Sequence, residues 1–98
     1  MLKIKYDFKG SVWKYESTAG WYFVSLPKKL SKEIRENSKD LEEGWGRLKV
    51  EAMIGKSQWK TAIWFDTKMD TYILPLKAEI RRHEKINVKE EISVKILV

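Results

Sequence analysis

The chain contains no cysteine, one histidine and two prolines. Without cysteine, neither a disulfide framework nor a thiolate metal site can form, and an intracellular, cytoplasmic location is favoured by default. One histidine with no cysteine cannot make an ordinary zinc site. The five glycines are dispersed, so there is no glycine-rich loop to hold a phosphate. We therefore expect neither a cofactor nor a bound metal.

Long apolar runs are also missing. The first ten residues alternate charged with apolar side chains, and nowhere is there a run of about eighteen apolar residues. The sequence predicts neither secretion nor a membrane-spanning helix, and we expect no membrane partner.

The length and composition favour one domain over residues 1–98 with a core of its own, since 43% of the residues are hydrophobic. The formal net charge is +6. Residues 1–49 carry eleven basic and seven acidic side chains, and residues 50–98 carry nine and seven, so the excess is +4 and +2. A charge spread in this way favours a solubility surface over a basic face for nucleic acid.

Three consecutive strands are predicted between Gly44 and Leu76. Apolar residues recur there at every second position, which is the period of a strand with one face in a core. In chain order these residues are Leu48, Val50, Ala52 and Ile54, then Trp59, Thr61, Ile63 and Phe65, then Tyr72, Leu74 and Leu76. A turn at 55–57 and a loop at 66–70 join the strands, so the pattern predicts a meander.

Both ends of the chain have strand patterns as well. Residues 2–17 predict a long strand in which Gly10 allows a bulge or bend. Its inward face carries Leu2, Ile4, Tyr6 and Phe8. After a turn at 18–20, residues 21–26 form a second strand that stops at Pro27, because proline cannot donate to a ladder. The last strand is predicted at residues 92–98.

Two helices are predicted between these strands, at 31–43 and 77–85. In the first, Ser31 can cap the free amides, and Gly44 sits where a left-handed residue often ends a helix. Leu30, Ile34 and Leu41 make only a thin apolar stripe, which is typical of a surface helix.

Six or so short strands with two helical interruptions predict a mainly β protein, a small closed or nearly closed barrel, because a sheet with so many inward apolar residues must cover its faces and edges. If the two terminal strands pair with each other or with the meander, the edges are removed within one chain. Otherwise edge pairing would give a dimer. We expect a monomer or a homodimer.

The sequence resembles the bacterial and archaeal domain of unknown function 1905 family over about residues 4–97. The residues that carry the resemblance are Trp21-Tyr22-Phe23-Val24, Leu26-Pro27, Gly44-Trp45-Gly46, Val50, Ile54-Gly55, Trp59-Lys60-Thr61, Tyr72, Leu74-Pro75, Lys77 and Arg81. The resemblance implies a small β-barrel of the double-split type, the broad architecture that includes the AbrB-type transcription factors. It implies no established activity, cofactor or catalytic residue. The chain departs from the family pattern at 61–66 and at Glu90-Glu91.

One group of residues suggests a binding site. Aromatic planes beside cationic groups suit an anionic or planar ligand. The candidates are Trp45, Trp59, Lys60, Thr61, Lys77 and Arg81, with Trp21 as a possible neighbour. In the competing interpretation Trp45 and Trp59 fill the core, Thr61 is a strand-face residue and the three cations are surface residues. We expect a non-catalytic domain that binds a small anionic ligand or an acidic peptide end at the barrel rim.

Two alternatives remain open. A single-stranded nucleic-acid module would stack bases on exposed aromatic residues, for which Trp13, Tyr15, Tyr22 and Trp64 are the candidates. A purely structural or oligomerisation domain would bind no ligand. Catalysis is not expected, because His83 lies among charged helix residues, and Asp66 and Asp70 are typical turn residues.

Overall fold

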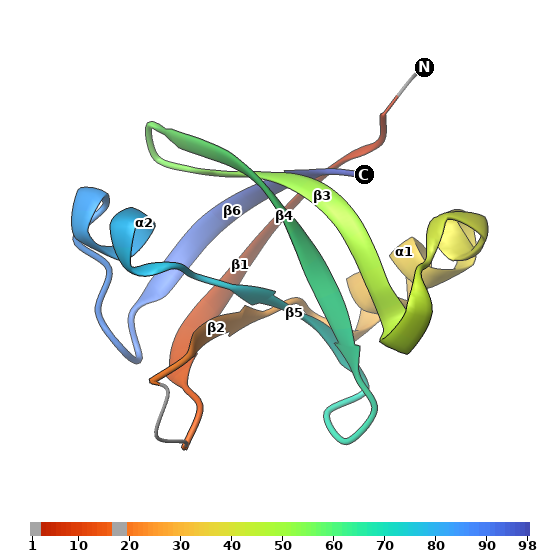
Figure 1. Cartoon of the computed structure of the whole chain (residues 1–98), viewed down its shortest axis with the longest axis horizontal. Coiled ribbons are helices and arrows are strands. Elements are labelled where there is room, and N and C mark those ends of the chain that lie inside the picture. Colours follow the sequence, from red (N-terminus) through yellow and green to blue (C-terminus); the bar gives the residue numbers. More distant parts are fainter. Residues whose placement is uncertain (1–2, 17–19) are drawn as a thin grey trace.

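Six strands close into a barrel in which every neighbouring pair is antiparallel (Figure 1). The structure is a computed structural model that describes residues 3–16 and 20–98. Its elements are β1 (Lys5–Lys14), β2 (Tyr22–Ser25), α1 (Lys28–Ser38), the 3₁₀ helices η1 (Lys39–Leu41) and η2 (Gly44–Gly46), β3 (Arg47–Ile54), β4 (Ser57–Asp66), β5 (Thr71–Pro75), α2 (Ala78–His83) and β6 (Glu91–Leu97). The predictions for Leu2 and for the turn at Thr18-Ala19 lie outside the described residues.

The order of strands around the barrel is β1-β2-β5-β4-β3-β6. The predicted meander is confirmed, because β4 pairs with β3 on one side and with β5 on the other. The terminal strands pair with each other from Lys5↔Leu97 to Ser11↔Glu91. The barrel is therefore closed within one chain. This is the first of the two predicted arrangements, in which the terminal strands pair with each other.

The core is built from the alternate residues that the strand patterns predicted. Val24, Ile63, Leu74 and Ile96, from four different strands, have no exposed surface. Ile4 is an exception, since it lies before the start of β1 and is 45% exposed. Burying one such aliphatic side chain is worth about 1.5–3 kcal/mol, so the inward residues supply the main drive for closing the barrel.

Gly10 marks the point where β1 changes its partner. Residues 5–11 pair with β6 and residues 12–14 pair with β2. The pairing with β6 continues through Gly10 without an extra residue, so the glycine permits a close approach and no bulge interrupts that ladder. A Cβ at this position would lie 2.7 Å from the carbonyl oxygen of Ser25 on β2. Only glycine lets the two strands approach this closely.

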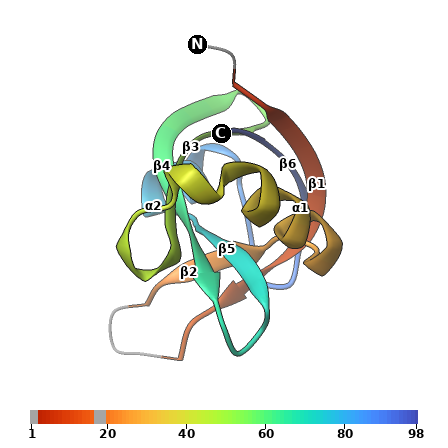
Figure 2. The same cartoon turned by 90° about the vertical axis from the view of Figure 1, so that its right-hand side faces the viewer.

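Helix α1 begins three residues earlier than predicted and lies across one end of the barrel (Figure 2). It starts directly after Pro27, and the Ser31 N–H already donates to the Pro27 carbonyl at 2.9 Å. Ser31 is therefore inside the helix and not at its cap. Its buried Oγ accepts the backbone N–H of Tyr72 at 2.9 Å, which ties the helix to β5.

The helix predicted at about 31–43 is present, and it also ends earlier than the sequence indicated. Helix α1 ends at Ser38 and continues only as the single turn η1. Leu41 thereby leaves the apolar stripe and is 59% exposed. The left-handed residues are Trp45 (φ 64°) and Gly46 (φ 70°), not Gly44, because the bridge between Glu43 and Arg47 closes a tight turn here. The chain enters β3 from this turn.

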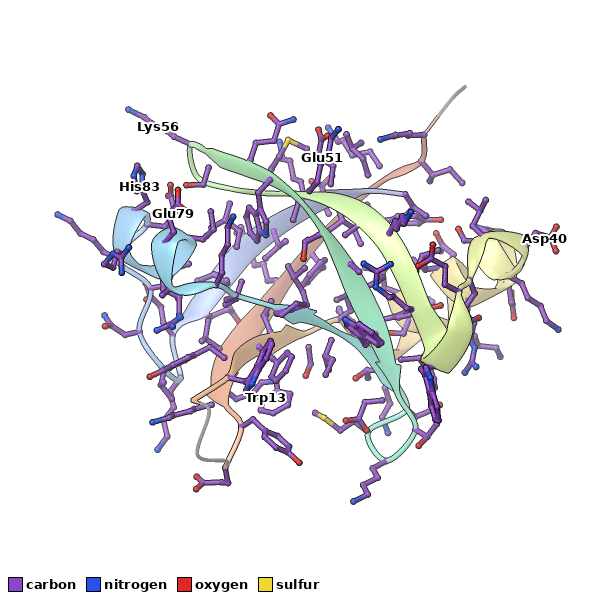
Figure 3. All side chains as sticks on the ribbon, viewed as in Figure 1. Trp13, Asp40, Glu51, Lys56, Glu79 and His83 are labelled. Carbon is purple, nitrogen blue, oxygen red and sulfur yellow. The ribbon has the colours of Figure 1, made fainter. Side chains whose placement is uncertain are left out.

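Helix α2 lies at the other end of the barrel from α1 and falls within the predicted range (Figure 1). The residue after it, Glu84, accepts a hydrogen bond from the Ser57 hydroxyl at 2.7 Å, at the tip of the β3–β4 hairpin. Figure 3 shows His83 and Glu79 on α2 and Lys56 on that hairpin. In the described part of the chain, no helix combines the length and apolarity needed to cross a bilayer.

Candidate binding site between β4 and β5

The strands β4 and β5 separate after a short ladder. Their pairing covers only Trp64↔Ile73 to Asp66↔Thr71, and beyond it β5 runs toward α2 while β4 continues to the hairpin tip (Figure 1). We call the space between them the split. It is bounded by the outer part of β4 on one side and by the end of β5 with the start of α2 on the other.

Proline explains where the ladder stops. The Tyr72 carbonyl of β5 accepts from the Leu26 N–H at 3.0 Å, and the N–H of Leu76, the residue after β5, donates to the Tyr22 carbonyl at 2.8 Å. Both residues therefore direct these backbone groups toward β2. The alternate residues, Ile73 and Pro75, then face β4. Pro75 has no N–H to donate, and pairing therefore cannot continue past Ile73.

The split contains a hollow of about 330 Å³. It brings together five of the six residues that the sequence singled out, with their predicted neighbour Trp21 and with Tyr22, which was predicted only for base stacking. The lining residues are Gly20, Trp21, Tyr22, Trp59, Lys60, Thr61, Pro75, Leu76, Lys77, Ala78 and Arg81. Among the described residues that line it are three cations and no carboxylate. The hollow therefore has the charge that an anion requires.

Arg81 is held in place by the protein. Its Nε donates to the Leu76 carbonyl at 3.1 Å, and its guanidinium carbon lies 3.7 Å from the centre of the Tyr22 ring. The Lys14 Nζ lies 5.8 Å from the centre of the same ring. The Tyr22 ring thus lies near two cations, and of these only Arg81 lines the hollow. Tyr22 was not predicted for this site, because its contact with Arg81 joins two elements that are far apart in the sequence.

Three of the other predicted residues, Trp59, Lys60 and Thr61, come from β4, and the fourth, Lys77, is the residue just before α2. Trp59 points inward and is 9% exposed. It therefore packs in the core and also lines the hollow. Thr61 is half-buried on the same face, and Lys60, one residue away, is exposed. The two interpretations of Trp59, as a core residue and as a site residue, are therefore compatible.

Trp45 is not part of this hollow. It lies on η2, at the start of β3, and is 92% exposed. The alternative that Trp45 fills the core is therefore wrong. Its left-handed backbone, between two glycines, turns the side chain out to solvent. The sequence Gly44-Trp45-Gly46 alone does not show that the backbone of Trp45 is left-handed.

A second hollow lies on the outer face of the barrel, and we call it the aromatic groove. It measures about 390 Å³ and is lined by Trp13, Tyr15, Trp21, Phe23, Trp64, Asp66, Ile73 and Pro75. The Trp13 and Phe23 rings lie 5.0 Å apart, and Figure 3 labels Trp13 on the lower part of the barrel. Three of the four residues predicted for base stacking meet here. The fourth, Tyr22, lines the split instead.

Helix α1 gathers cations on one flank. Lys28, Lys32 and Arg35, with Lys39 of η1, recur at spacings of three and four residues. They line a surface hollow of about 630 Å³, which Glu36 and Asp70 also line. Arg35 is already engaged, with its guanidinium carbon 3.9 Å from the centre of the Phe65 ring and a nitrogen 3.7 Å from Glu42. Charges that alternate along the sequence are thus sorted by the helix into a basic flank.

Several acidic side chains have partners within the fold. Glu43 pairs with Arg47 and, at 3.5 Å, with Lys49. The hydrogen bond from Arg47 lowers the pKa of Glu43, against a smaller opposing effect of desolvation. Asp66 accepts the backbone N–H groups of Lys68 and Met69 at 2.9 and 3.0 Å, as a turn residue does. Within residues 3–16 and 20–98, no group of three or more His, Asp or Glu side chains could hold a metal ion.

Comparison with known families gives one result. A family model described as a domain of unknown function (DUF1905) matches residues 8–96, nearly the whole chain, and confirms the resemblance found in the sequence. None of the curated proteins matches it.

Proposed function

Since the chain belongs to the DUF1905 family, whose description names no activity, we propose a function from the geometry: the split binds a small anionic ligand without catalysing a reaction. The observation that carries this proposal is the convergence of Lys60, Lys77 and Arg81 on one hollow that no described carboxylate lines. Cations without an acidic partner attract an anion and do not have to break an ion pair first.

The aromatic residues of the split support the same function. Trp21 and Tyr22 offer ring surface beside the cations, so a planar anion such as a carboxylate or an aromatic acid can both stack and pair. Trp59 forms an inner wall that keeps water from one side of the ligand. A cytoplasmic location, favoured by the lack of cysteine, is part of this proposal.

The test is an anion titration followed by NMR. Inorganic phosphate and citrate are the probes, and we expect concentration-dependent shifts of the backbone amides of Lys60, Lys77 and Arg81. The variant with Lys60→Gln and Lys77→Gln should bind about tenfold more weakly, since losing one charge-assisted contact costs about 1.5 kcal/mol or more. Lys95→Gln, at an exposed lysine of β6, is the matched control and should bind as the native chain does.

Two outcomes would argue against the proposal. One is a set of shifts spread evenly over the basic surface, with equal loss in the control variant. The other is no shift at all together with a stable oligomer in sedimentation velocity at several concentrations, which would favour an assembly role.

A second candidate function is supported by the aromatic groove. Trp13, Tyr15 and Trp64 share this groove, and the Arg47 guanidinium carbon lies 5.6 Å from the centre of the Trp64 ring. Stacking surfaces with a nearby cation suit single-stranded nucleic acid, and the basic flank of α1 adds positive charge on the same molecule.

This second candidate is tested by fluorescence anisotropy with an oligothymidylate of about 15 nucleotides. Affinity should fall steeply with salt, and Trp13→Ala or Trp64→Ala should weaken binding about fivefold or more. Trp45→Ala, at an exposed tryptophan outside the groove, is the control. Binding that does not respond to salt, or that depends on Trp45 as strongly as on Trp64, would remove the candidate.

A further inference from the structure

The split has an open backbone edge on β4. The β3–β4 hairpin turns through the two residues Gly55 and Lys56, so Ile54 and Ser57 form a hydrogen-bonded pair. By alternation, Ser57, Trp59, Thr61 and Ile63 direct their backbone groups toward β3. Gln58, Lys60 and Ala62 direct theirs to the other side, where β5 would continue.

In the described part of the chain, no strand lies on that side of Lys60. The β4–β5 register ends at Trp64↔Ile73, Pro75 cannot donate toward Ala62, and Lys77 already begins α2. Lys60 is exposed, its N–H and C=O point away from β3, and among the described residues no backbone hydrogen bond on the other side involves them. Its N–H and C=O therefore face the hollow that Lys77 and Arg81 also line.

An unpaired strand edge beside three cations selects one kind of ligand. An inorganic anion or a nucleotide phosphate would use the cations and leave the edge unused. An extended peptide uses both, because its main chain pairs with the edge and its terminal carboxylate meets the cations. Arg81 suits a carboxylate particularly well, since Tyr22 and the Leu76 carbonyl already hold its planar guanidinium in place.

We propose that the split binds the C-terminal end of an extended peptide, which adds a short strand to β4 at Lys60 and places its carboxylate between Lys77 and Arg81. This inference rests on the proposed function, because it gives the chemical class of the anion. The hollow of about 330 Å³ is at the small end of ligand sites, so the ligand is a short peptide end. Trp21 and Tyr22 then contact its last side chain.

The experiment compares four probes by NMR titration. They are N-acetyl-Ala-Val-Ala with a free carboxylate, the same peptide as its C-terminal amide, the same peptide N-methylated at its last residue, and acetate. The free-carboxylate peptide should bind at least about tenfold more tightly than each of the others, since each lacks either the charge or the backbone donor. Hydrogen exchange at the Lys60 amide should slow when this peptide binds and should be unchanged with acetate.

Variants locate the binding. Lys77→Gln should reduce the preference for the free carboxylate over the amide, and Lys95→Gln should leave it intact. Equal binding of acetate and the free-carboxylate peptide would overturn the inference and leave anion binding in place. If none of the probes shifts the amides of Lys60, Lys77 or Arg81, both the inference and the proposed function are wrong.

Discussion

The guanidinium carbon of Arg81, on α2, lies 3.7 Å from the centre of the Tyr22 ring, on β2. This contact joins two elements that are far apart in the sequence, at the edge of the hollow between β4 and β5. Arg81 therefore has a structural role in addition to the proposed one, and Lys60 does not share it. The two cations should respond differently to substitution.

Arg81→Ala removes the contact with Tyr22 and the hydrogen bond to the Leu76 carbonyl, so we expect a loss of about 1–2 kcal/mol in the free energy of unfolding. Lys60→Ala removes an exposed side chain and should change the free energy of unfolding by less than about 0.5 kcal/mol. Urea unfolding of both variants measures the difference. Equal losses would mean that Lys60 makes structural contacts as well.

Ser31→Ala should destabilise the fold by about 1–3 kcal/mol, because it leaves the backbone N–H of Tyr72 without a partner in a buried position. In a domain of this size that corresponds to a fall of at least about 4 °C in Tm. Ser93→Ala, at an exposed serine of β6, is the control and should have little effect. A Tm for Ser31→Ala equal to that of the control would show that the hydrogen bond contributes nothing.

Two glycine substitutions should have opposite outcomes. Gly10→Ala places a Cβ at 2.7 Å from the Ser25 carbonyl oxygen and 2.8 Å from a Val24 methyl, so strands β1 and β2 must move apart, and we expect a loss of about 2 kcal/mol or more. Gly44→Ala meets no atom within 4 Å and should be neutral or stabilise by up to about 1 kcal/mol. Thermal unfolding of both proteins is the measurement. A Gly10→Ala variant as stable as the native chain would contradict the close approach.

Stability should fall at alkaline pH through Tyr72. Burial raises the pKa of this phenol above its ordinary value, and the nearby Glu42 carboxylate acts in the same direction while Arg35 opposes it. The folded state favours the protonated form, so its contribution is complete below a pH of about 10 and is lost as the pH rises through the raised pKa.

Tyr72→Phe keeps the ring, which packs edge-on against Phe65 at 5.3 Å, and removes the ionisation. We therefore expect the urea midpoint of this variant to fall less steeply above a pH of about 10 than that of the native protein. Tyr15→Phe, at an exposed tyrosine, is the control. Parallel pH profiles for the native protein and Tyr72→Phe would show that another group causes the alkaline loss.

The sequence predicted the barrel because side-chain alternation is a local property. In β3 and β4 the inward residues follow from the two-residue period, and the short turn at Gly55-Lys56 fixes how these two strands pair. The helix boundaries were harder to predict from the sequence, since the role of Ser31 depends on Tyr72, which is 41 positions away. A serine before a charged helix has the same local pattern whether it caps the helix or faces the core.

The candidate site was predictable in its residue types and not in its shape. Two short segments supply the predicted residues: Trp59, Lys60 and Thr61 are consecutive, and Lys77 and Arg81 follow at a helical spacing. The site therefore requires only that these two segments lie close together in the fold. What places them together is the end of the β4–β5 ladder at Pro75, a consequence of register. The sequence did not show that Trp45 lies apart from this hollow, because a Gly-Trp-Gly turn can point its aromatic residue either way, and here the left-handed backbone exposes it.

Pairing of the first strand with the last has a kinetic consequence. Ile4 and Val98 exchange backbone hydrogen bonds in both directions, so the last ladder to close joins positions that are almost a full chain length apart. The β3–β4 hairpin needs only a two-residue loop and can form within about 1–10 μs. Closing the cylinder must wait for a much rarer encounter, and topologies dominated by such distant contacts fold in about milliseconds to seconds. Until that encounter, β1 and β6 present bare edges to other chains, and dilute refolding should therefore give higher yields than concentrated refolding.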